Sequence, residues 1–223
     1  MKTTLFATLK AHCAEDWNTY ITHAFVRGVG DGSLPRACFE HYLKQDYLFL
    51  LHFARAYALA VYKSTTLADM RHAKNTLAAL LDEEISLHTT FCAGWGISEA
   101  QMLAEPEATA NMAYTRYVLE TGNAGDLLDL HAALVPCVVG YAEVASWLMK
   151  QPSTTLDGNP YRDWIEMYAS DDYQSVAASA SAQLDDLGAR LGGEARIDRL
   201  SHIFHDATRL EIGFWQMGLD RSL

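Results

Sequence analysis

The chain has little of what builds nucleic-acid-binding, membrane or secreted proteins. Its 223 residues include 17 lysines and arginines against 28 aspartates and glutamates, for a formal charge of −11, with no basic stripe. Nucleic acid and anionic membranes are therefore not expected as partners. The longest uncharged apolar run, residues 132–142, is too short to cross a bilayer, and the N-terminus lacks a small-residue cleavage site. We expect a cytoplasmic protein.

Cysteines and strand-forming patterns are also scarce. The four cysteines, Cys13, Cys38, Cys92 and Cys137, lie far apart and form no CxxC pair. This spacing argues against a disulfide framework or a zinc site. No alternating polar and apolar run is flanked by hairpin turns. We expect free thiols and no β-sheet.

The sequence shows helical spacing of apolar residues along nearly its whole length, which predicts an all-α fold. No repeat or change of composition marks a boundary, so we expect one domain over residues 1–223. Ser98 and Gln101 match a capping box, whereas GVGDGS at 28–33 is predicted to connect helices because it lacks the ending of a phosphate loop. The expected helices cover approximately residues 3–26, 33–62, 67–91, 106–122, 125–150, 161–169, 172–191 and 194–217.

Asp46 lies on the apolar stripe of the second expected helix. Its neighbours three and four residues away are large and are not expected to pair with its charge: Tyr42, Leu43, Phe49 and Leu50. Burying an unpaired carboxylate costs several kcal/mol, so Asp46 needs a hydrogen-bond partner, a ligand or a wet cavity. A structural role, bonded to another helix's backbone or to Arg55, is equally open.

Glu211 repeats this pattern on the last expected helix and faces mostly inward. Its neighbours at helical spacing are Ala207, Thr208, Phe214 and Trp215. Burial should raise its pKa, which suits a group that holds and releases a proton near neutral pH. An interhelical ion pair is the structural alternative, although Arg209 is only two residues away and points elsewhere.

The stretch LVPCVVGYAEVASWL, residues 134–148, places unusual residues inside a helix. Pro136 should kink the helix and open space beside Cys137. Cys137 and Tyr141 share a face, and Gly140 would admit another backbone or a ligand. Most buried cysteines are inert packing, and spacing alone does not make Cys137 a nucleophile.

Taken together, these residues favour one aromatic-lined pocket that holds an acid pair, a thiol and several phenols. Such walls suit a flat ring. The carboxylates could bind a ring nitrogen or an exocyclic amine, and the thiol could add to an electron-poor ring carbon. We therefore interpret the pattern as a covalent-addition site for a heteroaromatic substrate.

The chain resembles the TenA/thiaminase II family over nearly its whole length. The resemblance rests on several segments in this order and spacing: FEHYLKQDYLFLLHFARAYALA (39–60), EEISLHTTF (83–91), AYTRYVLE (113–120), PCVVGYAEVASWL (136–148), YRDWIEMYAS (161–170) and EIGFWQMGL (211–219). It implies the heme-oxygenase-like helical bundle and a homotetramer. It also implies hydrolysis of an aminomethyl-pyrimidine or of thiamin to hydroxymethylpyrimidine, without a cofactor, in thiamin salvage.

The resemblance also assigns roles to individual residues. Cys137 matches the nucleophile of the cysteine-bearing branch, Glu211 the acid/base group and Asp46 the carboxylate that holds the ring and its amine. The matching pocket aromatics are Phe49, Tyr114, Tyr141 and Tyr168. Phe49 stands where relatives often carry tyrosine, so stacking is expected there and not a hydroxyl contact.

Two other classes of function are compatible with the sequence. The sequence has nine histidines, so a di-iron oxygenase is one alternative. Its iron ligands would come from one glutamate and four of the histidines: Glu84, His88, His131, His202 and His205. Glu84 and His88 are four residues apart, whereas such sites use a Glu and a His three apart, so no metal is expected. A non-catalytic pyrimidine-binding or regulatory protein is the second alternative.

Overall fold

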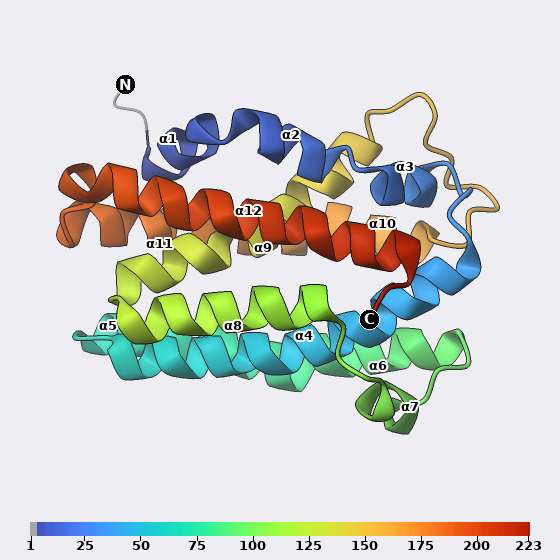
Figure 1. Cartoon of the computed structure of the whole chain (residues 1–223), viewed down its shortest axis with the longest axis horizontal. Helices are drawn as coiled ribbons and strands as arrows, with labels where there is room; N and C mark the ends of the chain where they lie inside the picture. The colour runs from blue at the N-terminus through green and yellow to red at the C-terminus, as the bar shows by residue number, and fades with distance from the viewer. Residues whose placement is uncertain (1–3) are drawn as a thin grey trace.

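The structure, a computed structural model, describes residues 4–223, which form helices joined by loops without any strand (Figure 1). This agrees with the predicted all-α fold. The elements are α1 (Leu5–His12), α2 (Ala14–Ile21), α3 (Ala24–Gly30), α4 (Arg36–Lys63), α5 (Leu67–Ala79), the π-helical turn η1 (Leu80–Glu84), α6 (Ile85–Gly94), α7 (Glu99–Ala104), α8 (Thr109–Ala124), α9 (Leu127–Leu148), α10 (Arg162–Ala169), α11 (Asp171–Arg190), the 3-10 turn η2 (Gly193–Arg196) and α12 (Ile197–Asp220).

Two helices, α9 and α12, hold the bundle together. Helix α12 packs against α1, α2, α4, α8 and α9, and α9 also packs against α8, α10 and α11. Figure 1 shows α12 running along the length of the molecule, with α8 and α4 below it and α1 and α2 above. Segments from both ends and the middle of the chain therefore meet along α9 and α12.

Helix α9 is the most apolar element. It is long and apolar enough to cross a membrane by length and composition, yet 89% of its apolar window is buried inside the protein. Asp126 caps its N-terminus in a capping box with Asp129, which the sequence analysis did not predict. Burial on all sides explains why this helix lacks a polar face.

The N-terminal region differs from the single helix expected over residues 3–26. Residue 3 lies outside the described residues, and the rest forms three short helices. Cys13 leaves helical geometry, with φ −124° and ψ 32°, and His23 is extended, with φ −55° and ψ 153°. The His23 ring accepts a hydrogen bond from the Phe25 amide and so starts α3. The local pattern was helical, but these two breaks bend the chain over α12 and α9.

Several other boundaries shifted. The helix expected over residues 33–62 begins three residues later, at Arg36, with Pro35 directly before it. The helix expected from Pro106 begins at Thr109. The Pro106 carbonyl instead accepts a hydrogen bond of 2.8 Å from Gln45 Nε2. The predicted third helix contains the π-helical turn η1, and the glycine stretch at 28–33 begins inside α3 before it leads to α4. The predicted capping box at Ser98 is confirmed, and residues 151–160, which separate two of the expected helices, contain no helix.

Candidate active site

Cys137 lies in the middle of α9 beside Pro136. Within residues 127–142 every residue except Cys137 is buried, and Cys137 keeps intermediate exposure. Some surface of Cys137 therefore remains accessible to solvent, and Pro136 lies within the helix directly before it. All four cysteines are free, which confirms the prediction for the thiols.

Glu211 approaches this thiol from α12. Its side chain is 1% exposed, and it accepts a hydrogen bond of 2.7 Å from the Tyr114 hydroxyl on α8. Glu211 also lies close enough to Cys137 for the two groups to shift each other's pKa. Burial raises the pKa of Glu211 to about 7, while the Tyr114 hydrogen bond and the nearby Cys137 thiol partly oppose this rise. The predicted inward orientation and raised pKa are both confirmed.

The Cys137 thiol is protonated at rest. Burial raises its pKa well above the ordinary value, and the negative charges of Glu211, Asp46 and Glu84 raise it further. A thiol in this setting becomes a nucleophile only if a neighbouring base takes its proton. Glu211 lies near the thiol and, with a pKa of about 7, is the neighbouring group suited to accept that proton.

Asp46 forms the other side of this cluster and is 6% exposed on α4. Burial raises its pKa well above the ordinary value, followed by the charges of Glu84 and Glu211, whereas the nearby Tyr42 side chain lowers it. Tyr42 thus influences the Asp46 carboxyl from four residues earlier on α4, while its hydroxyl proton is donated to Tyr141. Arg55 is not the partner of Asp46; it lies 3.0 Å from the His52 ring instead.

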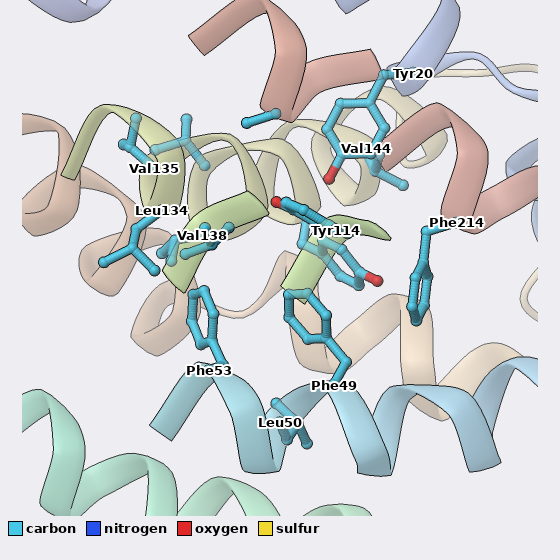
Figure 2. Packing of buried hydrophobic residues seen from close by; sticks show 14 of the residues in the cluster. Tyr20, Phe49, Leu50, Phe53, Tyr114, Leu134, Val135, Val138, Val144 and Phe214 are labelled. Atoms are coloured by element: carbon cyan, nitrogen blue, oxygen red, sulfur yellow. The ribbon is translucent and has the colours of Figure 1, made fainter. Parts of the chain in front are cut away.

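Aromatic side chains surround the three groups. The Phe49 ring lies 5.1 Å from Tyr114 and 5.6 Å from Phe214, and Figure 2 shows these rings between α4 and the helices opposite. The Tyr141 ring lies 4.9 Å from Tyr168. The structure thus brings together the four aromatic residues that the sequence singled out and the cluster of Cys137, Glu211 and Asp46.

Sequence reasoning missed Tyr20, which approaches from α2. Its buried hydroxyl has no hydrogen-bond partner among residues 4–223, yet it lies close enough to Glu211 to lower the pKa of that carboxyl. A side chain at Gly140 would overlap the Tyr20 ring. Gly140 therefore admits a tyrosine side chain and not the backbone or ligand that was expected.

Sequence reasoning also left Tyr42 and Trp164 out of the site. The Tyr42 hydroxyl donates to Tyr141 at 3.3 Å and accepts from the Trp164 indole at 3.3 Å. The signal for Tyr42 was its position four residues before Asp46, on the same helical face. The contact with Trp164 spans 122 residues of sequence, so no local pattern could have revealed it.

The residues considered for iron are separated in the fold. His88 bonds the Leu43 carbonyl, His202 lies at the Asp198 carbonyl and His205 lies at Asp16. Across residues 4–223 no group of three histidines, cysteines or acids is arranged to hold a metal. The cluster of Cys137, Glu211 and Asp46 offers hydrogen bonds, protons and a thiol.

Two surface hollows lie away from the cluster. One, of about 670 Å³, is lined by residues of α8 and α12 such as Arg116, Tyr117 and Arg199, and the other, of about 570 Å³, lies beside Trp17 and Trp147. Cys137, Glu211 and Asp46 line neither hollow. These two hollows are therefore not the predicted substrate pocket.

The protein is thus an all-α bundle whose core brings a thiol and two carboxyls together among aromatic rings. The same architecture occurs in a Shewanella denitrificans domain described as having a heme oxygenase-like fold, with a TM-score of 0.77 and 15% identity over 97% of this chain and 92% of that one. The sequence profile of the TENA/THI-4/PQQC family matches residues 11–221. The chain belongs to this family.

Individual relatives are similar over nearly their full length. The aminopyrimidine aminohydrolase of Halalkalibacterium halodurans is 36% identical over 93% of this chain and 92% of its own. A crystal structure described as a TenA family transcription regulator from Silicibacter sp. TM1040 is 49% identical, with a TM-score of 0.90 and 96% of both chains covered. The family resemblance expected from the sequence is confirmed.

Proposed function

We propose that the protein is an aminopyrimidine aminohydrolase of the thiaminase II type. It would hydrolyse an aminomethyl-pyrimidine, or thiamin, to hydroxymethylpyrimidine in thiamin salvage. The observation that carries the proposal is the gathering of two buried carboxyls, Glu211 and Asp46, around the Cys137 thiol, near enough for each to raise its pKa. Relatives at 30–36% identity over most of the chain are named aminopyrimidine aminohydrolase, which supports this activity.

The first step of the proposed reaction moves the thiol proton to the substrate ring. Glu211 takes the proton of Cys137 and delivers a proton to a ring nitrogen, while the sulfur bonds to the adjacent ring carbon. Protonation of the ring makes that carbon electrophilic, so the acid and the thiol act together. A carboxyl with a pKa of about 7 can perform both transfers at neutral pH.

The second step exchanges the substituent on the methylene carbon. In the sulfur adduct the ring expels the protonated amine as ammonia, or the thiazolium of thiamin, and water then adds to the methylene carbon and releases a proton. The carbon–sulfur bond then breaks, Glu211 returns the ring-nitrogen proton to the sulfur, and hydroxymethylpyrimidine leaves beside the restored Cys137 thiol. Each of the two catalytic groups would contribute a few kcal/mol of barrier lowering in such a scheme.

Asp46 and the aromatic residues hold the ring in this proposal. Asp46 accepts a hydrogen bond from the exocyclic amine, and Phe49 stacks on the ring. The roles proposed for the phenols are contacts with Glu211 for Tyr114 and hydrogen bonding at the pocket wall for Tyr141 and Tyr168. The Phe49 and Tyr114 rings, 5.1 Å apart, contact each other directly and would form one wall of this site.

Turnover of purified protein on two substrates tests the proposal. We expect hydroxymethylpyrimidine to form from aminomethyl-pyrimidine, from thiamin or from both, with the ratio of kcat/KM values identifying the preferred compound. Ammonia release should match product formation one to one for the aminomethyl substrate. No product from either compound, with correctly folded protein, would overturn the proposed activity.

A non-catalytic regulator is the second candidate, because the 49% identical Silicibacter structure is described as a transcription regulator. A binder would retain affinity for hydroxymethylpyrimidine and show no turnover to lose on changing Cys137. We also propose cytoplasmic location and a homotetramer, in keeping with the family resemblance. Sedimentation equilibrium would measure the oligomeric state.

A further inference from the structure

His88 on α6 touches α4 with both nitrogens of its ring. Nε2 lies 2.9 Å from the Leu43 carbonyl oxygen, and Nδ1 lies 3.5 Å from Oδ2 of Asp46. Both side chains are 9% exposed. The ring is thus held between a backbone acceptor and the candidate substrate-binding carboxyl.

The two contacts define where protons can lie. A carbonyl oxygen can only accept a hydrogen bond, so Nε2 carries a proton. In the neutral ring Nδ1 then offers a lone pair, which would face the lone pairs of an ionised carboxylate unfavourably. The approach of Nδ1 to Oδ2 is favourable when one proton lies between them.

We propose that His88 is a positioning residue that accepts a shared proton from Oδ2 of Asp46 and so leaves Oδ1 as a pure acceptor for the substrate. This inference rests on the proposed function, because the donor it prepares for is the exocyclic amine of an aminopyrimidine.

Burial determines on which partner the proton resides. It lowers the pKa of His88 to about 4 and raises that of Asp46 well above its ordinary value. Both directions favour a neutral imidazole beside a protonated carboxyl over an ion pair. The proton therefore resides on Asp46 in the ligand-free protein.

The other groups around the pair agree with this assignment. They are titratable side chains of several elements, and none is a lysine or arginine: Tyr42 and Tyr47 on α4, Glu84 on η1, Cys92 on α6, Cys137 and Tyr141 on α9, Tyr168 on α10 and Glu211 on α12. The acids among them disfavour a further negative charge on Asp46.

Orientation follows from the fixed proton. A carboxyl whose proton is free to sit on either oxygen presents a donor to the pocket part of the time, and that donor would oppose an incoming N–H group. With the proton held toward Nδ1, the second oxygen only accepts. His88 thereby selects a ligand that donates at this position, such as a ring amine, over one that accepts.

Three substitutions separate the two contacts of His88. His88→Gln can keep the donor to Leu43 but loses the acceptor at Nδ1, and His88→Asn keeps an amide oxygen near Nδ1 but not the contact with Leu43. His88→Leu removes both. His202→Gln on exposed α12 surface is the matched control.

Binding of hydroxymethylpyrimidine, measured by calorimetry, is the main readout because it does not require turnover. We expect the dissociation constant to rise on the order of tenfold to a hundredfold in His88→Gln and His88→Leu, as for loss of a buried hydrogen bond. His88→Asn should recover part of the affinity. An analogue without the ring amine should bind His88→Gln and wild type with similar affinity.

The pH dependence of binding identifies the site of the proton. Loss of an acceptor for the protonated carboxyl lowers the pKa of Asp46, so the limb of the profile that Asp46 controls should move to lower pH in His88→Gln. A move to higher pH would indicate an ion pair and overturn the proposal. Wild-type affinity and an unchanged profile in both Gln and Leu variants would also overturn it.

Nitrogen-15 NMR of histidine-labelled wild-type protein tests the proton assignment without any substitution. The expected spectrum shows His88 protonated at Nε2 with Nδ1 accepting a hydrogen bond at neutral pH. Protonation at Nδ1 with a bare Nε2 would overturn the inference even if every variant fails to fold. If wild type does not bind an aminopyrimidine at all, the proposed function fails, while this spectrum still decides the His88 assignment.

Discussion

The Tyr114 hydroxyl donates a 2.7 Å hydrogen bond to Glu211 and so joins α8 to α12 at the carboxyl that also meets the Cys137 thiol. One acid thus has a fixed phenol on one side and the candidate nucleophile on the other. A carboxyl held in this way keeps a single orientation toward the space beside Cys137, which is the arrangement that proton transfer requires.

Changing Tyr114 to phenylalanine should alter the pH profile more than the maximal rate. The Tyr114 bond lowers the pKa of Glu211, which is about 7 in the intact protein, so its loss should raise that pKa. We expect the limb of the kcat/KM profile controlled by Glu211 to move to higher pH, with less than about a tenfold loss at the optimum. A profile that moves to lower pH would contradict the proposed role of this bond.

Changing Cys137 to serine should abolish turnover while leaving the fold intact. The hydroxyl is a weaker nucleophile, and we expect kcat to fall by about 10³-fold or more. Cys38→Ser is the matched control, since this thiol bonds the Leu219 carbonyl outside the cluster and should leave kcat close to wild type. A wild-type rate in the Cys137 variant would remove the thiol mechanism.

Changing Glu211 to glutamine should make stability less dependent on pH. The folded-state pKa of about 7 lies above the ordinary 4.5, so the contribution of Glu211 is fully present below pH 4.5 and is lost as pH rises through 7. The loss amounts to about 3 kcal/mol for this pKa difference. In urea unfolding, the free energy of unfolding of the variant should therefore rise relative to that of wild type between pH 4.5 and pH 8. A difference in stability that is constant with pH would contradict this expectation.

Changing Gly140 to alanine should destabilise the protein, because the added methyl group would overlap the Tyr20 ring. Overpacking of this kind costs about 1–3 kcal/mol. Gly213→Ala on α12 is the control: nothing lies within 4 Å of the point that its methyl group would occupy, and helix propensity should stabilise it by up to about 1 kcal/mol. The Tm should therefore fall in Gly140→Ala and rise in Gly213→Ala.

The general fold and the three central residues could be predicted from the sequence because both depend on local periodicity. Acids at Asp46 and Glu211 stood out among apolar neighbours, and Pro136 marked the helix that carries Cys137. The family resemblance then assigned their roles. These signals are all contained within one helix at a time.

The rest depended on contacts between distant segments. His88 and Asp46 are on different helices, and Tyr20 reaches Gly140 across more than half of the chain, so neither pairing leaves a local pattern. The breaks at Cys13 and His23 lie in a stretch whose spacing is helical throughout. Tertiary packing on α9 and α12 decides such features, and it overrides weak local propensity.

The position of α12 has a consequence for how the protein is made. This last long helix contacts α1, α2, α4, α8 and α9, and it supplies Glu211. During synthesis the other helices leave the ribosome before α12, so Glu211 reaches Cys137 only after all of them have been made. A nascent or cleaved chain without α12 would carry the thiol without its proton acceptor, and it would be inactive however well its remaining helices packed.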